Sequence, residues 1–381
     1  MTIGEVCSTI SDTYRAKADK VTLINTSDVL EGKVLNHTQV PNKELKGQFK
    51  KTFKKNDILY SEIRPQNKRF AFVDFDPVDY IASTKLMVLR ADASKVLPMY
   101  LYFYLKSAPV IAELQMLAET RSGTFPQITF TELSTLSIPV PSITEQEVIV
   151  TTIKSIEDKI DCNADINDNL QQQAFALFDK LLTTEHPESC SLSEIAELNP
   201  KRSLAKNEMA RYIDMAQLST SGSFPNGWEI KPYNGGMRFK NGDTLLARIT
   251  PCLENGKTAY IDFLDTNEVA FGSTEYVVMC SQGQYPSEFF YCLARYPSFV
   301  DYAVKNMNGS SGRQRVTAET IGKYSLPQLT DDELSEFRDV VPVLFSTMRL
   351  NSLENIHLSE LRDALLPKLM SGEIDVSDIQ L

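Results

Sequence analysis

The sequence predicts an α+β fold: two mixed α/β domains related by internal duplication and joined by two long helices that form an antiparallel coiled coil. Three observations predict it. Residues 53–75 align with residues 239–261, and each half of the chain ends in about 40 residues with apolar side chains at heptad spacing. These two heptad segments also account for the whole net negative charge. At 381 residues, the chain is long enough for several domains with a sizeable core.

These patterns divide the chain into five segments. We expect a mixed domain over residues 1–141, a helix over 142–185, a second mixed domain over 186–329, a second helix over 330–373 and a tail over 374–381.

The duplication is an ordered series of matches whose offset stays between 186 and 190 residues. The matched pairs include Phe53/Phe239, Lys54/Lys240, Asp57/Asp243, Leu59/Leu245, Ile63/Ile249, Pro65/Pro251, Ser83/Ser273 and Ile138/Leu326. Each half contains two β-rich runs around a polar turn, followed by a helical stretch. The β-rich runs are 57–63 and 69–75 in the first half and 243–250 and 257–263 in the second, and the helical stretches are 98–120 and 286–307.

The two heptad segments predict helices with defined ends. Ser142-x-x-Glu145 and Thr330-x-x-Glu333 are capping boxes at their starts, and Gly372 suits the end of the second helix. Both segments carry two asparagines among the apolar seam positions, and these are Asn163, Asn167, Asn351 and Asn355.

The asparagines predict a register for the coiled coil. In an antiparallel pair, Asn163 falls in the layer of Asn355, and Asn167 falls in the layer of Asn351. Side-chain amides that bond across the seam would fix the register at some cost in stability. The alternative is that the four amides are solvated breaks in a loose coil.

The charge is unevenly distributed. The net charge of −11 equals the sum of the two helical segments, −6 over residues 143–185 and −5 over 331–373. The β-rich regions are basic in both halves, with 9 basic and 3 acidic residues over 42–70 and 5 and 2 over 231–257. Basic patches of this kind favour a nucleic-acid partner, whereas the acidic helices should face protein.

Signatures of an enzyme are missing from the sequence. It has no phosphate-binding G-x-x-x-x-G-K-[ST], no G-x-G-x-x-G, no G-x-S-x-G and no metal-ligand spacing. The [DN]-P-P-[YFW] signature of amino-methyltransferases is also absent. Six scattered cysteines, with no signal peptide and no apolar run of about 20 residues, predict a cytoplasmic protein without a membrane partner.

The junction Ile138-Pro139-Val140-Pro141-x-x-x-Glu145-Gln146, with Ile149, Ile153 and Ile156, resembles that of specificity subunits of type I restriction–modification systems. The C-terminal run 365–374, LLPKLMSGEI, is similar to the end of many such subunits. The second junction departs from the pattern, since Glu333 is followed by leucine instead of glutamine. The resemblance covers essentially the whole chain.

The resemblance implies a non-catalytic subunit whose mixed domains are target-recognition domains, each reading one half of a bipartite DNA site. It implies that two adenine-specific methyltransferase subunits dock on the helices and that restriction and translocation subunits join the complex through them. S-adenosylmethionine would bind to the methyltransferase, and this chain would bind no cofactor and no metal. Because the two domains differ strongly in sequence, we expect a non-palindromic double-stranded DNA site, with the helices setting its spacer.

We expect DNA contacts from the basic β-rich regions and from a compact polar loop at residues 309–315. The candidates are Lys50, Lys51, Lys54, Arg64, Lys68, Arg69, Arg121 and Gln127 in the first half and Arg238, Lys240, Arg248, Lys257, Arg313, Gln314 and Arg315 in the second. Among these, Gln127, Arg313, Gln314 and Arg315 are candidates for reading base edges, because arginines and amides supply sequence readout. For any one of them, a solvated surface position is the alternative.

Two other functions fit the same architecture. One is a specificity subunit of another methylation-based defence complex. The other is a bivalent scaffold whose end domains bind proteins, although basic regions recurring in both halves disfavour it.

Overall fold

The computed structural model describes residues 1–16, 18–43, 47–121, 125–184, 187–310 and 312–377, and these form two compact units. The first unit contains residues 1–158 and 358–381, and the second contains residues 159–357. Each unit therefore holds one mixed domain together with parts of both long helices. The fold is α+β, as the sequence predicts.

The main sheet of each unit has four antiparallel strands in the same order. In the first unit the order is β1 (Cys7–Ile10), β10 (Leu86–Ala91), β7 (Ile58–Ser61) and β8 (Phe70–Phe72). In the second it is β12 (Ala196–Leu198), β19 (Tyr276–Ser281), β16 (Thr244–Ala247) and β17 (Thr258–Tyr260). The central strands are apolar and buried on both faces, which is why they lack an alternating pattern in the sequence.

A second four-stranded sheet also recurs, and in both units it contains one parallel pair. Its order is β5 (Gln39–Pro41), β2 (Lys20–Ile24), β9 (Tyr80–Ser83) and β6 (Phe49–Lys51) in the first unit. In the second unit it is β14 (Glu229–Pro232), β13 (Met209–Ile213), β18 (Ala270–Gly272) and β15 (Met237–Phe239). Two sheets with matching strand orders and matching parallel pairs establish that the halves are structural copies.

Helices predicted over residues 98–120 and 286–307 are present, each broken into two. They are α2 (Pro98–Lys106) and α3 (Ala108–Arg121) in the first unit and α7 (Ser287–Arg295) and α8 (Pro297–Lys305) in the second. Most of their aromatic side chains are buried, and Tyr100, Phe103 and Phe289 have no exposed surface and belong to the apolar cores of the two units. These aromatic side chains therefore serve as core residues.

Short elements complete the units. In the first unit they are α1 (Ile3–Val6), η1 (Thr26–Asp28), β3 (Val29–Leu30), β4 (Lys33–Val34), η2 (Pro65–Asn67) and α4 (Phe130–Leu133). In the second they are β11 (Ser189–Ser191), α6 (Leu192–Ile195), η3 (Met215–Gln217), α9 (Ala318–Gly322) and β20 (Ser325–Pro327).

The long helices are α5 (Ile143–Thr183) and α10 (Asp331–Ser371), 41 residues each. Both begin at the predicted capping boxes. The backbone N–H of Ser142 donates to Glu145 at 2.7 Å, and that of Thr330 donates to Glu333 at 2.7 Å. Gly372, with φ of +76°, follows the end of α10 in the left-handed region that favours glycine.

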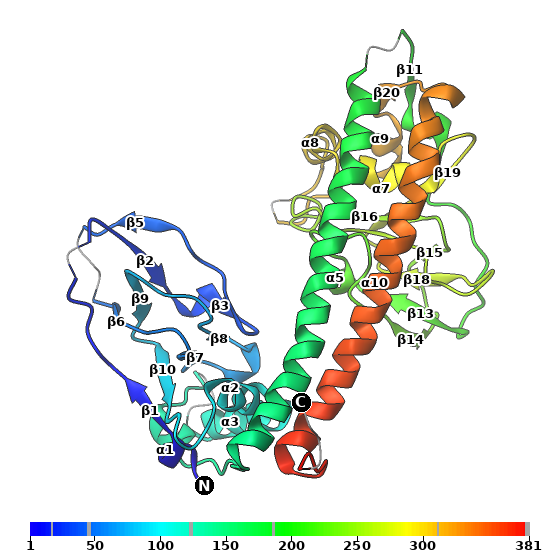
Figure 1. The fold of residues 1–381 in the computed structure, drawn as a ribbon. Coiled ribbons are helices and arrows are strands. Elements are labelled where there is room, and N and C mark those ends of the chain that lie inside the picture. Colours follow the sequence, from blue (N-terminus) through cyan, green and yellow to red (C-terminus); the bar gives the residue numbers. More distant parts are fainter. Residues whose placement is uncertain (17, 44–46, 122–124, 185–186, 311, 378–381) are drawn as a thin grey trace. The chain divides into compact units, whose positions relative to one another are not determined.

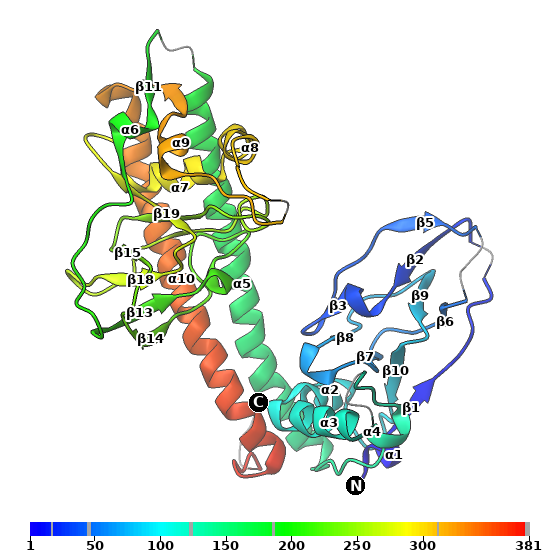
Figure 2. The ribbon, with the colours of Figure 1, turned by 180° about the vertical axis from the view of Figure 1, so that it is seen from behind.

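The helices run antiparallel, because each unit combines the start of one with the end of the other. In the first unit, Ile149 and Ile153 of α5 share a core with Leu369 of α10. In the second, Phe178 of α5 shares a core with Phe337 of α10. Within the second unit the two helices lie side by side in both views (Figures 1 and 2).

Candidate nucleic-acid interface

The β7–β8 connection in the first unit is a tight basic turn. Arg64 and Lys68 flank η2 with φ values of +43° and +51°, in the left-handed region that side chains rarely adopt. The side chain of Gln115 in α3 accepts a hydrogen bond from the Gln66 N–H at 3.2 Å. Arg64 is exposed, and Lys68 is exposed in an ion pair with Glu31 at 3.0 Å.

Two predicted DNA-contact residues of the first unit, Lys51 and Arg69, form hydrogen bonds to backbone carbonyl oxygens within the fold. Lys51 donates to the carbonyl oxygens of Thr84 and Leu86 at 3.1 and 2.7 Å, and burial lowers the pKa of its ammonium group. Arg69 donates to the carbonyl oxygens of Ser27 and Val29 at 3.0 and 3.3 Å. These two cations therefore hold neighbouring strands and loops together.

The predicted DNA-contact residues differ in their exposure to solvent. Exposed candidates are Lys50, Lys54, Arg64 and Lys68 in the first unit and Lys240 and Arg313 in the second. Lys257 donates to the Met215 carbonyl oxygen at 2.8 Å, and Arg238 lies 5.8 Å from the Tyr233 ring centroid. Arg121 is the last residue of α3, and its side chain lies outside the described residues.

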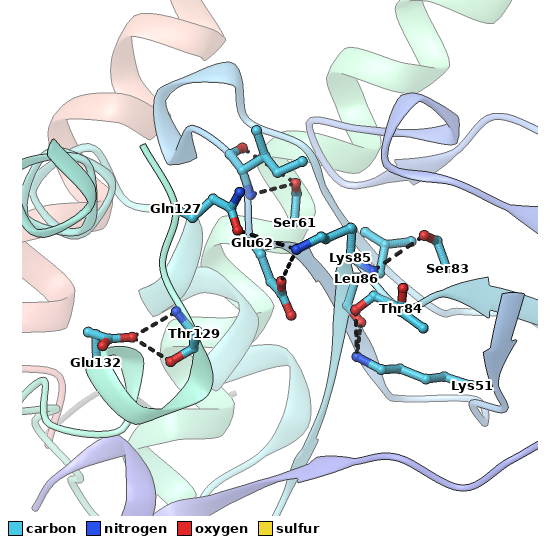
Figure 3. A network of polar contacts seen from close by, with 11 residues as sticks. Lys51, Ser61, Glu62, Ser83, Thr84, Lys85, Leu86, Gln127, Thr129 and Glu132 are labelled. Atoms are coloured by element: carbon cyan, nitrogen blue, oxygen red, sulfur yellow. Dashed lines mark hydrogen bonds and ion pairs between the residues drawn. The ribbon is translucent and has the colours of Figure 1, made fainter. Parts of the chain in front are cut away.

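A polar network joins three segments of the first unit at the end of β7 (Figure 3). Lys85 forms an ion pair with Glu62 at 3.5 Å and donates to the Gln127 side chain at 3.3 Å. The segment carrying Gln127 pairs with the β7 segment through an isolated bridge between Gln127 and Ile63. The network thus combines residues 62, 85 and 127, which are distant in the sequence.

The second unit has an ion-pair network at the same place. Glu275 accepts hydrogen bonds from Arg315 at 2.8 to 2.9 Å and from Arg248 at 3.2 Å. The hydrogen bonds from Arg315 and the nearby charge of Arg248 lower the pKa of the Glu275 carboxyl. Gln314 lies beside Arg315 in the sequence and is half-buried. Its backbone carbonyl oxygen accepts a hydrogen bond from the Thr250 N–H at 3.1 Å.

Three members of these networks, Glu62, Lys85 and Glu275, were not among the residues predicted from sequence. The sequence does indicate that Lys85 and Glu275 are equivalent, because each follows a Ser-Thr pair that the duplication repeats. Because the two residues have opposite charges, a comparison of residue types alone does not match them.

Trp228 belongs to an aromatic cluster. Its ring stacks on Phe263 with centroids 4.5 Å apart, and both side chains pack against one of the apolar cores of the second unit. Its role is therefore packing within that unit.

The seam asparagines form hydrogen bonds between the helices. Asn163 donates to Asn355 at 2.9 Å, and Asn351 donates to Asn167 at 2.9 Å. Asn163 is fully buried and also donates to Glu354 at 2.7 Å. The pairs are the ones that an antiparallel crossing of the two heptad segments predicts.

Within the described ranges the chain offers neither a metal site nor a membrane span. No group of three or more His, Cys, Asp and Glu side chains is arranged to hold a metal ion there. The helices of the same ranges include none with the length and apolar character needed to cross a bilayer.

Comparison with known proteins identifies the family. Residues 1–172 match the family model described as the type I restriction modification DNA specificity domain. Over 98% of its length the chain is 31% identical to the type I restriction enzyme HindI specificity subunit of Haemophilus influenzae, and the match covers 98% of that protein. The chain belongs to the type I restriction enzyme specificity subunits.

Further relatives of this specificity subunit agree. The type I restriction enzyme MjaIX specificity subunit of Methanocaldococcus jannaschii is 23% identical over 80% of the chain and 77% of its own length. Among solved structures, the type I restriction-modification S subunit of M. genitalium matches 97% of the chain and 95% of its own, with a TM-score of 0.59 and 16% identity. This likeness supports the fold of the specificity subunit.

Proposed function

We propose that this specificity subunit directs a methyltransferase to a non-palindromic, two-part DNA site, with the domain of residues 1–141 reading one part and that of residues 186–329 the other. The observation that carries the proposal is the duplicated pair of sheets, which repeats the strand order while the surface residues differ. Two domains with the same fold and different surface residues suit two different half-sites. The chain itself would carry no catalysis, and adenine would be the methylated base.

The exposed cations would supply most of the affinity. Lys50, Lys54 and Arg64 in the first domain and Lys240 and Arg313 in the second are exposed. Contacts of such side chains with phosphates orient a protein on the duplex without reading its sequence, and they make binding dependent on salt. Base-edge contacts from side chains held in a fixed geometry would then supply the specificity.

The long helices would set the distance between the two parts of the site. A helix of 41 residues is about 60 Å long at 1.5 Å per residue. At about 3.4 Å per base pair, this length corresponds to at most about 17 base pairs of B-form DNA. In this proposal the asparagine pairs keep the spacing constant, since a slip of the helices would break the hydrogen bonds of Asn163 and Asn167.

The outer faces of the helices would bind methyltransferase subunits. On α10, Val343 and Leu350 are 63% and 60% exposed and lie seven residues apart, on one face of the helix. Asp339 precedes Val343 by four residues and Glu354 follows Leu350 by four, and the net charge of −5 over residues 331–373 would repel DNA and favour a protein partner. Because the units are structural copies, we propose two methyltransferase subunits, which would bind S-adenosylmethionine and connect the chain to the restriction and translocation subunits.

The experiment is a methylation map. Host DNA is sequenced for N6-methyladenine after co-expression of this chain with its methyltransferase and, as the control, after expression of the methyltransferase alone. We expect a motif in two unequal parts around a fixed gap, present only with this chain. A soluble, co-purifying pair that produces no chain-dependent motif would contradict the proposal and favour a protein-binding scaffold.

A further inference from the structure

The two polar networks occupy one backbone frame that the duplication repeats. The frame joins the end of a sheet strand, the segment entering the next strand and a returning loop. In the first domain the Glu62 N–H donates to the Lys85 carbonyl oxygen at 3.0 Å, and in the second the Arg248 N–H donates to that of Glu275 at 3.0 Å. The frame therefore has the same geometry in both domains at this bond.

Two further backbone contacts extend the match. The N–H of Ile128 donates to the Glu62 carbonyl oxygen at 2.9 Å, and the N–H of Val316 donates to that of Arg248 at 3.0 Å. The isolated bridge between residues 63 and 127 corresponds to the bridge between residues 249 and 315. Glu62, Lys85 and Gln127 are thus equivalent to Arg248, Glu275 and Arg315.

The side chains on this frame are inverted in charge. The position at the strand end is acidic in the first domain and basic in the second, and the position entering the next strand is basic in the first and acidic in the second. The loop position changes from neutral Gln127 to cationic Arg315. Because the backbone hydrogen bonds persist with either set of side chains, the fold does not dictate the residue types.

In both domains the carboxylate lies deeper than the cations. The side chains of Glu62 and Glu275 are 18% and 22% exposed, whereas those of Lys85, Arg248 and Arg315 are 49%, 30% and 39% exposed. A carboxylate beneath exposed donors restricts their orientation, which is what base readout requires of a long side chain. The frame can therefore present oriented polar groups at the surface.

We propose that this frame is a base-reading site in each domain, with Arg248 selecting guanine in one half-site and Gln127 selecting adenine in the other. The described hydrogen bond of the Arg248 side chain uses Nε, which leaves its terminal N–H groups for guanine O6 and N7. The Gln127 side-chain oxygen accepts from Lys85 through one lone pair. Its second lone pair and its amide N–H groups match adenine N6 and N7.

The inference rests on the proposed function, and its test separates the two. The chain, co-purified with its methyltransferase, selects bound duplexes from a random 40-base-pair DNA library, which are then sequenced. The variants are Arg248→Lys and Arg315→Lys, which keep the charge beside Glu275 but lose the planar fork, and Gln127→Ala. Arg338→Lys in α10 is the matched control. Thermal unfolding and co-purification with the methyltransferase confirm that each variant is folded.

We expect Arg248→Lys to reduce a guanine preference about tenfold at one base pair of one half-site and to leave the other half-site unchanged. Gln127→Ala should reduce an adenine preference in the other half-site, and Arg315→Lys should act in the same half-site as Arg248→Lys. A wild-type motif retained at every position by these variants, or affinity lost equally for all sequences, would overturn the assignment. If the wild-type complex enriches no motif, the proposed function itself fails.

Discussion

Folding perturbs the ionisation of Asp262, a residue of the second unit that lies beside Arg349 of α10. Burial raises the pKa of its carboxyl to about 7, and nearby Glu288 raises it further while Arg349 of α10 lowers it. Arg349 donates to the carbonyl oxygen of Asp262 at 3.1 Å, which keeps the arginine beside the carboxyl group. The charged form of Asp262 is therefore disfavoured in the folded state.

The substitution Asp262→Asn should make stability less dependent on pH. The unfolded carboxyl loses its proton near pH 4 and the folded one near pH 7, so the wild-type free energy of unfolding should fall as pH rises between these values. The stability of the variant relative to wild type should grow by about 2 kcal/mol between pH 5 and pH 8. Urea unfolding at both values measures it, with exposed Asp301→Asn as the control. Equal pH profiles would show that Asp262 ionises normally.

Whether a basic side chain is exposed to solvent also differs from one residue to the next. Lys51 and Lys50 are neighbours of the same type, yet Lys51 donates to carbonyl oxygens within the fold and Lys50 is exposed. Alternating residues of a strand point to opposite faces, so neighbours in β6 have different environments. Composition identified the basic region, but it did not show which of its cations face solvent.

At the scale of elements, the paired helices combine an apolar seam with two polar layers. Asn163 has no exposed surface, and its amide contacts Asn355, Glu354 and Lys159. A buried amide with satisfied hydrogen bonds stabilises one register, because a shifted register would leave it unpaired.

A double-mutant cycle of Asn163→Ala, Asn355→Ala and the double variant tests the role of this layer. We expect Asn163→Ala to lower the free energy of unfolding by about 1–2 kcal/mol, since Asn355 and Glu354 lose a buried partner. The two substitutions should be coupled by about 0.5–1 kcal/mol. Urea unfolding measures each variant, and Asn169→Ala, exposed on the same helix, is the control. Additive effects would favour solvated breaks over a register device.

At the scale of the whole molecule, the proposed spacer can be changed by adding residues where α5 leads into the second domain. Four residues inserted between Thr183 and Glu188 should lengthen the unread gap of the methylated motif and leave both of its read parts unchanged. The physical reason is that the helices would set the distance between the two recognition domains. N6-methyladenine sequencing gives the gap directly.

The control for this experiment is the same insertion at Gly283. This residue is exposed with φ of +68° in a turn, so added residues there should leave the gap as it is. An unchanged gap in the Thr183–Glu188 variant would contradict the role of the helices in setting the spacer.

The sequence by itself determined the duplication, the two heptad helices with their capping boxes, the basic regions and the pairing of the asparagine layers. These features are periodic or repeated at a constant offset, so they can be recognised along the chain. Only the tertiary structure decided which cations are exposed, and that Glu62, Lys85 and Gln127 share one frame with the charge-inverted Arg248, Glu275 and Arg315. The physical reason is that these contacts depend on the register of strands and loops far apart in the sequence, which no local pattern encodes.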